Sequence, residues 1–223
     1  MLVRLYPLVA LTICWSIAQE PLPNCRYDDV ATAHQSYQDW AITLLDTIYA
    51  VDPSYMPPDL VSVSEIGLTG DFRLRQVLLA DLEALMAAAA SAGHPLAIQS
   101  AFRSYDYQQR TFQYWVDRDG YEYALRSSAR AGHSEHQLGT AIDFRSQDGP
   151  APWDVSDWAL TPAGGWMAEH AWQYGFVMSY PKDREQDTCY IYEPWHYRYV
   201  GKSTAKDIKQ RETTLRAWLW TRQ

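Results

Sequence analysis

Two short segments of the chain carry side chains suited to metal-dependent hydrolysis. The first runs from Ser134 to Asp143 (SEHQLGTAID) and the second from Glu193 to His196 (EPWH). His136, Asp143 and His196 supply two imidazoles and one carboxylate, and a catalytic zinc takes three such protein ligands while keeping a fourth position open. Glu193 lies three residues before His196. It can therefore come close to the ion without being a ligand, and it is the candidate base.

Spacing alone leaves alternative assignments open for these residues. His133, three residues before His136, is a competitor for the metal, and an aspartate such as Asp143 can simply face solvent from a strand. Ser134 could also be read as a nucleophile. We reject that reading because a metal supplies an activated water, and a separate base for a serine is then not needed.

Elements of secondary structure must position each of these side chains. Residues 140–144 (TAIDF) are expected to form a strand, in which Ile142 faces opposite to Asp143 because side chains alternate along a strand. Residues 196–200 form a second expected strand, which could lie next to the first and bring His196 to the same site. Pro194 biases Glu193 toward an extended conformation.

The rest of the pattern predicts an α+β fold with an antiparallel sheet, because helices dominate early and adjacent strands late. Apolar residues at spacings of three and four predict amphipathic helices, and Ser104 is the expected N-cap of one that reaches Gly120. The expected helices cover residues 37–48, 74–93, 104–120, 121–127, 162–174 and a segment from 203 onward. The expected strands cover 96–102, 140–144, 176–180, 189–193 and 196–200, with a hairpin joining 176–180 to 189–193 and a loop over 51–70.

Composition and charge indicate one globular domain that does not bind nucleic acid. The 223 residues are 47% hydrophobic and 21% charged, which is too hydrophobic for a disordered chain. A length of this size favours one domain. The formal net charge of −8 argues against a basic face that neutralises nucleic-acid phosphates. We therefore expect no nucleic-acid partner.

The N-terminal segment predicts export. Arg4 is followed by an apolar run that ends in a small-x-small pattern at residues 16–18 (SIA), so residues 1–18 are expected to be a signal peptide. The run is too short to span a bilayer comfortably; an uncleaved anchor is the alternative. Residues 19–26 are then a linker and residues 27–223 a single domain, periplasmic or otherwise extracytoplasmic. There Cys25 and Cys189 could form a disulfide or remain two separate thiols.

Three motifs, in order along the chain, give the sequence a family resemblance. It resembles the VanY-type D-alanyl-D-alanine carboxypeptidases, the zinc M15 peptidases of bacterial cell walls. The match runs from about residue 74 to residue 200. The first motif is the serine-x-His-x-x-Gly-x-Ala-x-Asp signature of the family, which is matched by Ser134, His136, Gly139, Ala141 and Asp143. The second is the EPWHYRYVG segment at residues 193–201. The third is SAFRSY at residues 100–105, where Phe102 replaces the usual tyrosine.

The resemblance implies a role for each site residue. It implies zinc as the cofactor, with His136, Asp143 and His196 as ligands, and a catalytic role for Glu193. It places Arg103 beside the substrate, where its planar guanidinium can hold a carboxylate or polarise a carbonyl. The implied fold is a small antiparallel sheet with helices packed on it and the zinc site at the sheet. Residues implied to lie near the bound peptide are Gln108, Ser134 and Tyr180.

These inferences combine into one expected function. The protein is expected to be an exported zinc carboxypeptidase that hydrolyses the C-terminal D-Ala of peptidoglycan stem peptides or muropeptides. An L,D-carboxypeptidase and a peptidoglycan endopeptidase of the same fold are alternatives. A cell-wall binding module without turnover is an alternative of another class. The presence of Glu193 argues against that last alternative, because binding alone needs no base.

Overall fold

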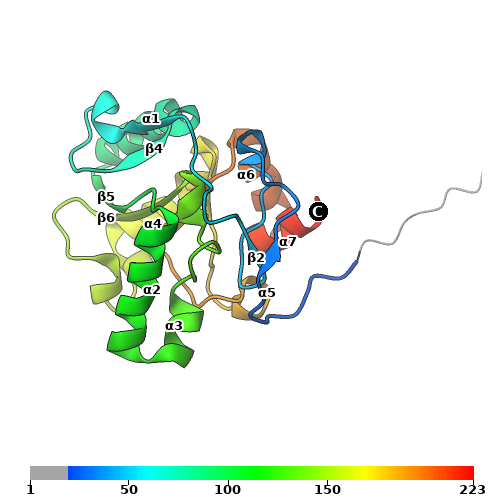
Figure 1. Ribbon diagram of the computed structural model, residues 1–223. Coiled ribbons are helices and arrows are strands. Elements are labelled where there is room, and N and C mark those ends of the chain that lie inside the picture. The colour runs from blue at the N-terminus through cyan, green and yellow to red at the C-terminus, as the bar shows by residue number, and fades with distance from the viewer. Residues whose placement is uncertain (1–19) are drawn as a thin grey trace, which may run out of the picture.

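The computed structural model describes residues 20–223, so the expected signal peptide lies outside the described residues. The fold is α+β, as predicted, with a four-stranded antiparallel sheet and helices packed around it (Figure 1). The helices are α1 (Leu79–Ser91), α2 (Tyr105–Asp119), α3 (Tyr121–Ser127), α4 (Pro162–His170), α5 (Glu185–Thr188), α6 (Lys202–Arg211) and α7 (Leu215–Trp220). The strands are β1 (Val30–Ala31), β2 (Tyr49–Ala50), β3 (Leu60–Ser62), β4 (Arg73–Arg75), β5 (Leu96–Ser100), β6 (Ala141–Ser146), β7 (Phe176–Met178) and β8 (His196–Tyr199).

The main sheet has two faces of opposite character. Its strand order is β5-β6-β8-β7, and Ile142 and Asp143 of β6 pair with Tyr197 and His196 of β8. Because side chains alternate along a strand, Ile142 and Tyr197 enter the main hydrophobic core. Asp143 and His196 point to the opposite face, so the sheet that organises the core also presents these two polar side chains together.

Helices α1 and α4 cover the apolar face. Leu82 and Leu85 of α1 and Met167 of α4 share a core with Phe144 of β6. In Figure 1, α1 lies above the sheet, whereas α2 and α3 extend below it as a pair. A second apolar cluster joins α6 and α7 to the segment around Leu44.

The predicted helix over residues 37–48 is wrong. The structure has a single 3-10 turn at Tyr37–Asp39, followed by turns that lead into β2. Leu44 and Leu45 are both buried but belong to different apolar clusters. The Asp46 carboxylate also accepts hydrogen bonds from the backbone N–H groups of Ile48 and Tyr49. These side-chain hydrogen bonds to the backbone compete with helix formation. The spacing of apolar residues arises because Leu44 and Leu45 pack into two different clusters, and not because they share one face of a helix.

The expected loop over residues 51–70 contains a strand. β3 pairs with β4 in an antiparallel ladder, and α1 begins at Leu79, later than the predicted residue 74. Leu74 is fully buried, but it is buried from β4. Strands of three residues are too short to show a period of two, so the sequence predicts β3 as part of a loop and the end of β4 as the start of a helix.

The predicted strand over residues 189–193, and its hairpin with 176–180, is also wrong. β7 pairs with β8 instead. Cys189 ends the short helix α5 with a left-handed backbone (φ 69°), which interrupts an extended run. The N–H of Glu193 donates to the carbonyl of Tyr180. Residues 189–193 are thus held by single hydrogen bonds and not by the ladder of a strand.

The expected C-terminal helix is two helices. α6 ends at Arg211, and Thr214 caps α7 by accepting a hydrogen bond from the N–H of Ala217. The other predicted helices and strands are confirmed within a few residues. Ser104 caps α2 as expected, because its hydroxyl accepts from the N–H of Tyr107.

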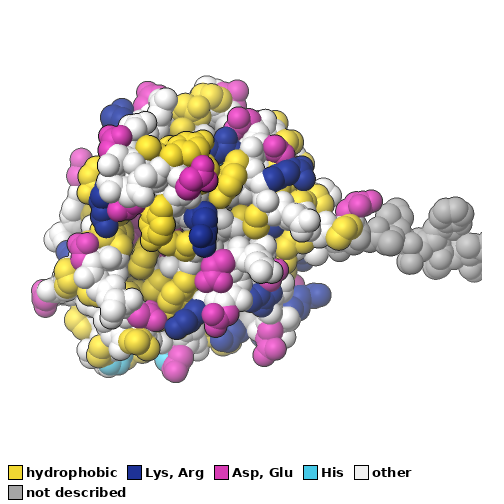
Figure 2. Space-filling model, turned by 90° about the horizontal axis from the view of Figure 1, so that it is seen from below, with side chains coloured by type: hydrophobic (Ala, Val, Ile, Leu, Met, Phe, Trp, Pro, Cys, Tyr) yellow, Lys and Arg dark blue, Asp and Glu magenta, His cyan; other side chains and the backbone are white. Residues whose placement is uncertain are grey.

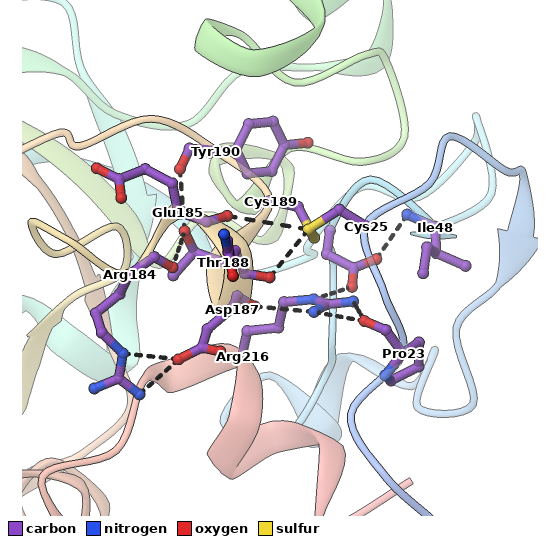
Figure 3. Close-up of a disulfide and its surroundings, with 12 residues drawn as sticks. Pro23, Cys25, Ile48, Arg184, Glu185, Asp187, Thr188, Cys189, Tyr190 and Arg216 are labelled. Atoms are coloured by element: carbon purple, nitrogen blue, oxygen red, sulfur yellow. Dashed lines mark hydrogen bonds and ion pairs between the residues drawn. A yellow bond between two sulfur atoms is a disulfide. The ribbon is translucent and has the colours of Figure 1, made fainter.

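The structure contains the Cys25–Cys189 disulfide that the sequence left as one of two alternatives, with the two Cα atoms 5.3 Å apart (Figure 3). It ties the N-terminal segment to the end of α5. Beside it, the buried Arg216 guanidinium donates to the Asp46 carboxylate and to the carbonyl of Pro23. Among residues 20–223, no helix has both the length and the apolar character to cross a bilayer.

Candidate functional site

Three elements bring the predicted ligand residues together. The 3-10 turn η4 (Glu135–Leu138) carries His136, while β6 and β8 carry Asp143 and His196 at directly opposed positions. One ligand atom from each residue lies within 4.8 Å of the other two, and all three side chains are buried. Asp143 and His196, 53 positions apart in sequence, thus meet because two antiparallel strands share one register, and the turn η4 adds His136 to them.

A tight turn sets the position of His136. Gly139 ends η4 with a φ of +71°. A Cβ there would lie 2.8 Å from Leu60 Cδ2 and 2.9 Å from Arg75 Cγ, so a larger residue would be both strained and crowded. The His136 Nδ1 atom lies 2.6 Å from the carbonyl oxygen of Ala101. A proton on Nδ1 satisfies this contact and leaves a lone pair on Nε2.

One ring nitrogen of His136 is available to a ligand. Its Nε2 atom is buried, has no hydrogen-bond partner within the described chain, and lies 3.3 Å from Asp143 Oδ2. Burial, together with Arg103, lowers the pKa of His136 to about 4, which favours the neutral imidazole that binds metals. Burial favours a protonated Asp143, but the two histidines hold the pKa of that carboxyl well below its usual range. A neutral imidazole and a carboxylate fit a cation between them.

His196 is held from both sides. Its Nδ1 atom lies 3.0 Å from Asp143 Oδ1, and its Nε2 atom lies 3.0 Å from Glu135 Oε2. Burial opposes a charge on His196, but the hydrogen bonds to Asp143 and Glu135 outweigh it and raise the pKa of His196 to about 10, which favours a ring that donates to both carboxylates. A cation would replace the Nδ1 proton, with Nε2–H still donating to Glu135. A carboxylate on the second nitrogen is a common way to orient a metal-binding histidine.

Glu135 is a site residue that the sequence motifs did not reveal. The Arg198 Nη1 atom donates to Glu135 Oε1 over 3.0 Å, and the Ser179 hydroxyl donates to Oε2 over 2.6 Å. Burial opposes the charge on Glu135, but Arg198 and His196 outweigh it and lower its pKa to about 2. The alternation of side chains along β8 was a signal for this residue. Arg198 lies two residues after His196 and therefore points to the same face of the sheet, where a buried guanidinium needs an anionic partner such as Glu135.

Glu193 stands beside the donor cluster. Its Oε2 atom is 3.9 Å from His196 Nδ1, and its backbone is fixed by the hydrogen bond to Tyr180. Burial raises the pKa of the Glu193 carboxyl to about 8, although His196 favours its charged form. A carboxyl group whose pKa is raised in this direction is better able to return a proton that it has accepted.

Arg103 lies on the other side of Asp143. Its Nη1 atom is 3.6 Å from Asp143 Oδ2 and donates to the Ser100 hydroxyl over 2.6 Å. Its Nε atom donates to Gln108 Oε1 over 2.7 Å, while the Gln108 amide donates to the carbonyl of Ala129. Gln108 is fully buried and does not line the cleft. The structure therefore places it behind Arg103, where it orients the guanidinium.

A cleft of about 630 Å³ contains the donor cluster. Ser134 and Tyr180 line it, as do Glu193 and Arg103. His133, the competing histidine, lies elsewhere: its ring nitrogens contact the carbonyl of Asp46 and the carboxylate of Asp29. Helix α2 forms a further wall of the cleft with residues that the sequence analysis did not single out: Tyr107, Arg110, Thr111, Tyr114, Trp115 and Arg118.

Known proteins are similar to this chain in sequence. The family model of VanY, D-alanyl-D-alanine carboxypeptidase, matches residues 71–202. The YodJ protein of Bacillus subtilis (strain 168) is 36% identical over 179 residues, 78% of this chain, and the match spans 65% of YodJ. The chain thus spans just under two thirds of that relative.

Two solved structures extend the likeness to three dimensions. The LdcB LD-carboxypeptidase is 34% identical with a TM-score of 0.69, covering 78% of this chain and 83% of that one. A mutant of the vancomycin-resistance D,D-pentapeptidase VanY in complex with Zn(II) is 27% identical with a TM-score of 0.70, covering 81% and 99%. The fold is therefore shared with these two peptidases, and the family match over residues 71–202 includes the three motif segments.

Proposed function

Since the chain belongs to the VanY family of D-alanyl-D-alanine carboxypeptidases, we propose that it is an exported zinc carboxypeptidase that removes the C-terminal D-Ala of peptidoglycan stem peptides. The observation that carries the proposal is the buried His136–Asp143–His196 cluster, which shares one cleft with Glu193 and Arg103. The Zn(II) in the similar VanY structure supports zinc as the metal.

The residues of the cluster fit zinc. His136 through Nε2, His196 through Nδ1 and the Asp143 carboxylate would hold it, which leaves room for a fourth ligand. When bound, the ion supplies Lewis acidity, which makes a water molecule more acidic and polarises a carbonyl group. Nε2–H of His196 donating to Glu135 and Nδ1–H of His136 donating to the carbonyl of Ala101 would leave these two nitrogens free for the ion.

Glu193 transfers the proton, and Arg103 contacts the substrate. Glu193 takes a proton from the attacking water on its carboxylate and returns it to the amine that leaves. Arg103, held by Ser100 and Gln108, presents a fixed guanidinium to the substrate. It can hold the carboxylate of the chain end or stabilise negative charge on the scissile carbonyl oxygen.

The test is mass spectrometry of purified pentapeptide muropeptides after incubation with the zinc-loaded protein. We expect loss of one D-Ala. Glu193→Gln should keep zinc and fold while losing about 10²- to 10⁴-fold in turnover, the contribution of a general base. Pentapeptides that stay intact under wild-type protein would contradict the proposal, as would normal turnover in Glu193→Gln.

An L,D-carboxypeptidase is the second candidate, because LdcB, with 34% identity, is named as one. The same experiment with tetrapeptide muropeptides separates the two. Loss of D-Ala from tetrapeptides alone would favour the second candidate. Cleavage within cross-linked peptides would indicate an endopeptidase, and zinc binding with no cleavage of any substrate would indicate a cell-wall binding module.

The role of Arg103 can be resolved by pairing its variants with substrate variants. If Arg103 binds the terminal carboxylate, amidating the peptide C-terminus should slow wild type strongly and Arg103→Ala little. If it contacts the scissile carbonyl, the substitution should lower kcat on both peptides alike. Wild-type rates of Arg103→Ala on both peptides would remove Arg103 from the site.

Export of the protein is part of the proposal. It rests on the sequence of residues 1–18 and on the Cys25–Cys189 disulfide, which is stable in oxidising compartments. The native protein isolated from its cell envelope should begin near Gln19 by mass spectrometry. An intact Met1 form recovered from the cytoplasm, with both thiols reduced, would contradict export.

A further inference from the structure

The cleft continues beyond the candidate metal centre along one face of α2. We call the side chains of Tyr107, Arg110, Tyr114, Trp115 and Arg118 the α2 wall; all five line the same cleft as His136. They recur at the spacings of three and four that place residues on one helical face. The eleven positions from Tyr107 to Arg118 correspond to about 16 Å along the helix axis. An extended peptide covers that length with about five residues, whereas a terminal dipeptide spans about 7 Å.

Aromatic packing joins the α2 wall to the catalytic segment. Trp115 meets Trp153 edge to face with ring centroids 6.1 Å apart, and Trp153 meets Trp195 in the same way at 6.2 Å. Trp195 directly precedes His196. Edge-to-face pairs are favourable and geometrically defined, so the wall holds a fixed place relative to the donor cluster. A ligand in the cleft can contact both at once.

The α2 wall carries positive charge in an acidic protein. Arg110 is exposed and has no ion-pair partner among residues 20–223; its guanidinium lies 5.7 Å from the centre of the Tyr107 ring. The Arg118 guanidinium lies 4.5 Å from the centre of the Trp115 ring. Asp119 also lines the cleft, and its Oδ1 atom is 3.3 Å from the Nε atom of Arg118. The face of the molecule in Figure 2, seen from the side to which α2 extends, mixes charges of both signs without a continuous basic surface.

We propose that the α2 wall binds the peptide segment that precedes the cleaved residue, and that Arg110 and Arg118 select segments bearing free carboxylates. This inference rests on the proposed function, because it assumes that a peptide C-terminus occupies the metal end of the cleft. The guanidinium groups supply paired donors for carboxylates. Tyr107 and Tyr114, 54% and 58% exposed, offer apolar ring surface to the backbone and aliphatic parts of the same segment.

Charge identifies the occupant as an acidic peptide. Aromatic rings alone would also suit a sugar, but a neutral sugar gains little from two cations. With a net charge of −8, the protein as a whole repels an anionic peptide, so local cations are needed to hold one. Amidation of the upstream carboxylates removes this attraction. The wall therefore distinguishes acidic from amidated substrates at positions remote from the cleaved bond.

The test compares two synthetic pentapeptides that end in D-Ala-D-Ala. One carries two glutamates upstream and the other carries two glutamines in their place. For the zinc-loaded wild-type protein we expect kcat/KM to be on the order of tenfold higher for the acidic peptide, the effect of two partly exposed charge pairs. The double variant Arg110→Gln/Arg118→Gln should bring this ratio close to one. General structural damage would slow both peptides alike and leave the ratio unchanged.

A matched control removes two positive charges elsewhere. Lys206 and Lys209 are exposed on α6 and do not line the cleft, so Lys206→Gln/Lys209→Gln alters net charge equally and should keep the wild-type preference. The inference is overturned if the arginine double variant keeps the preference, or if the lysine double variant loses it to the same extent.

Binding separates this inference from the proposed reaction. Calorimetric titration of both peptides into Glu193→Gln protein reports affinity without turnover. Wild type could cleave neither peptide while Glu193→Gln binds the acidic peptide more tightly and loses this preference when both arginines are replaced. The proposed reaction would then be wrong, and the inference about the α2 wall would be supported. If neither cleavage nor binding distinguishes the peptides, the inference about the wall is wrong.

Discussion

Neighbouring residues of the main sheet point to two faces that have different functions: one face packs in the hydrophobic core, and the other carries the donor cluster. On β6, Ile142 and Phe144 enter the main core, while Asp143 between them belongs to the donor cluster. On β8, Tyr197 is in that core, and His196 and Arg198 are on the other face. The apolar face relies on close packing, whereas the polar face relies on directed hydrogen bonds to buried charges. Substitutions one residue apart should therefore damage different properties.

The largest effect is expected at the polar face. His136→Ala should abolish zinc binding, because it removes one of three protein ligands. Elemental analysis of the purified variant should show almost no zinc, against about one ion per chain in wild type. His133→Ala is the matched control, since His133 is equally buried but bonds to Asp46 and Asp29. Full zinc occupancy in His136→Ala would remove that residue from the ligand set.

Next in size is a change at the apolar face. Phe144 packs edge to face with Phe176 and Tyr197, so Phe144→Ala should lower the free energy of unfolding by about 3–5 kcal/mol through lost burial and a cavity. Urea denaturation of the metal-free proteins measures this loss. Ile142→Val should cost only about 0.5–1.5 kcal/mol. No loss of unfolding free energy in Phe144→Ala would contradict the assignment of close packing to the apolar face.

A smaller effect is expected behind the donor cluster. Glu135→Gln removes the charge that orients His196 and neutralises Arg198, and should weaken zinc binding by about 10- to 100-fold, as is usual for groups that hold a ligand. Competition with a chelator measures the zinc dissociation constant. Ser179→Ala, which removes one hydrogen bond to the same carboxylate, should weaken it less. Unchanged affinity in Glu135→Gln would show that His196 needs no such support.

The smallest change is expected at a hydroxyl on the apolar face. Tyr197 is buried, and its OH has no hydrogen-bond partner within the described chain. Tyr197→Phe should leave the free energy of unfolding unchanged or raise it by about 1 kcal/mol, because an unsatisfied buried group is removed. Tyr199→Phe, which breaks the hydrogen bond to Asp81, should lower it by about 1 kcal/mol. Thermal melts of both variants distinguish these outcomes.

Local patterns in the sequence were sufficient for the α+β class, for the capped helix α2 and for the alternation that separates Ile142 from Asp143. They also selected His136, Asp143 and His196, which the structure brings together. Their roles as zinc ligands, the roles of Glu193 and Arg103, and the signal peptide remain predictions. What succeeded depended on neighbours within a few residues, where spacing and backbone geometry are directly linked.

Tertiary structure decided what depends on distant partners. The apolar spacing of residues 37–48 looks helical, but Leu44 and Leu45 pack into separate clusters. The charge of Glu135 is stabilised by Arg198, 63 residues away, and Trp115 of the α2 wall packs against Trp153, which comes from another segment that lines the same cleft. The sequence lists side chains and their local order. Which buried charge finds which partner, and which helical face lines a cavity, is set by packing between segments that no local pattern relates.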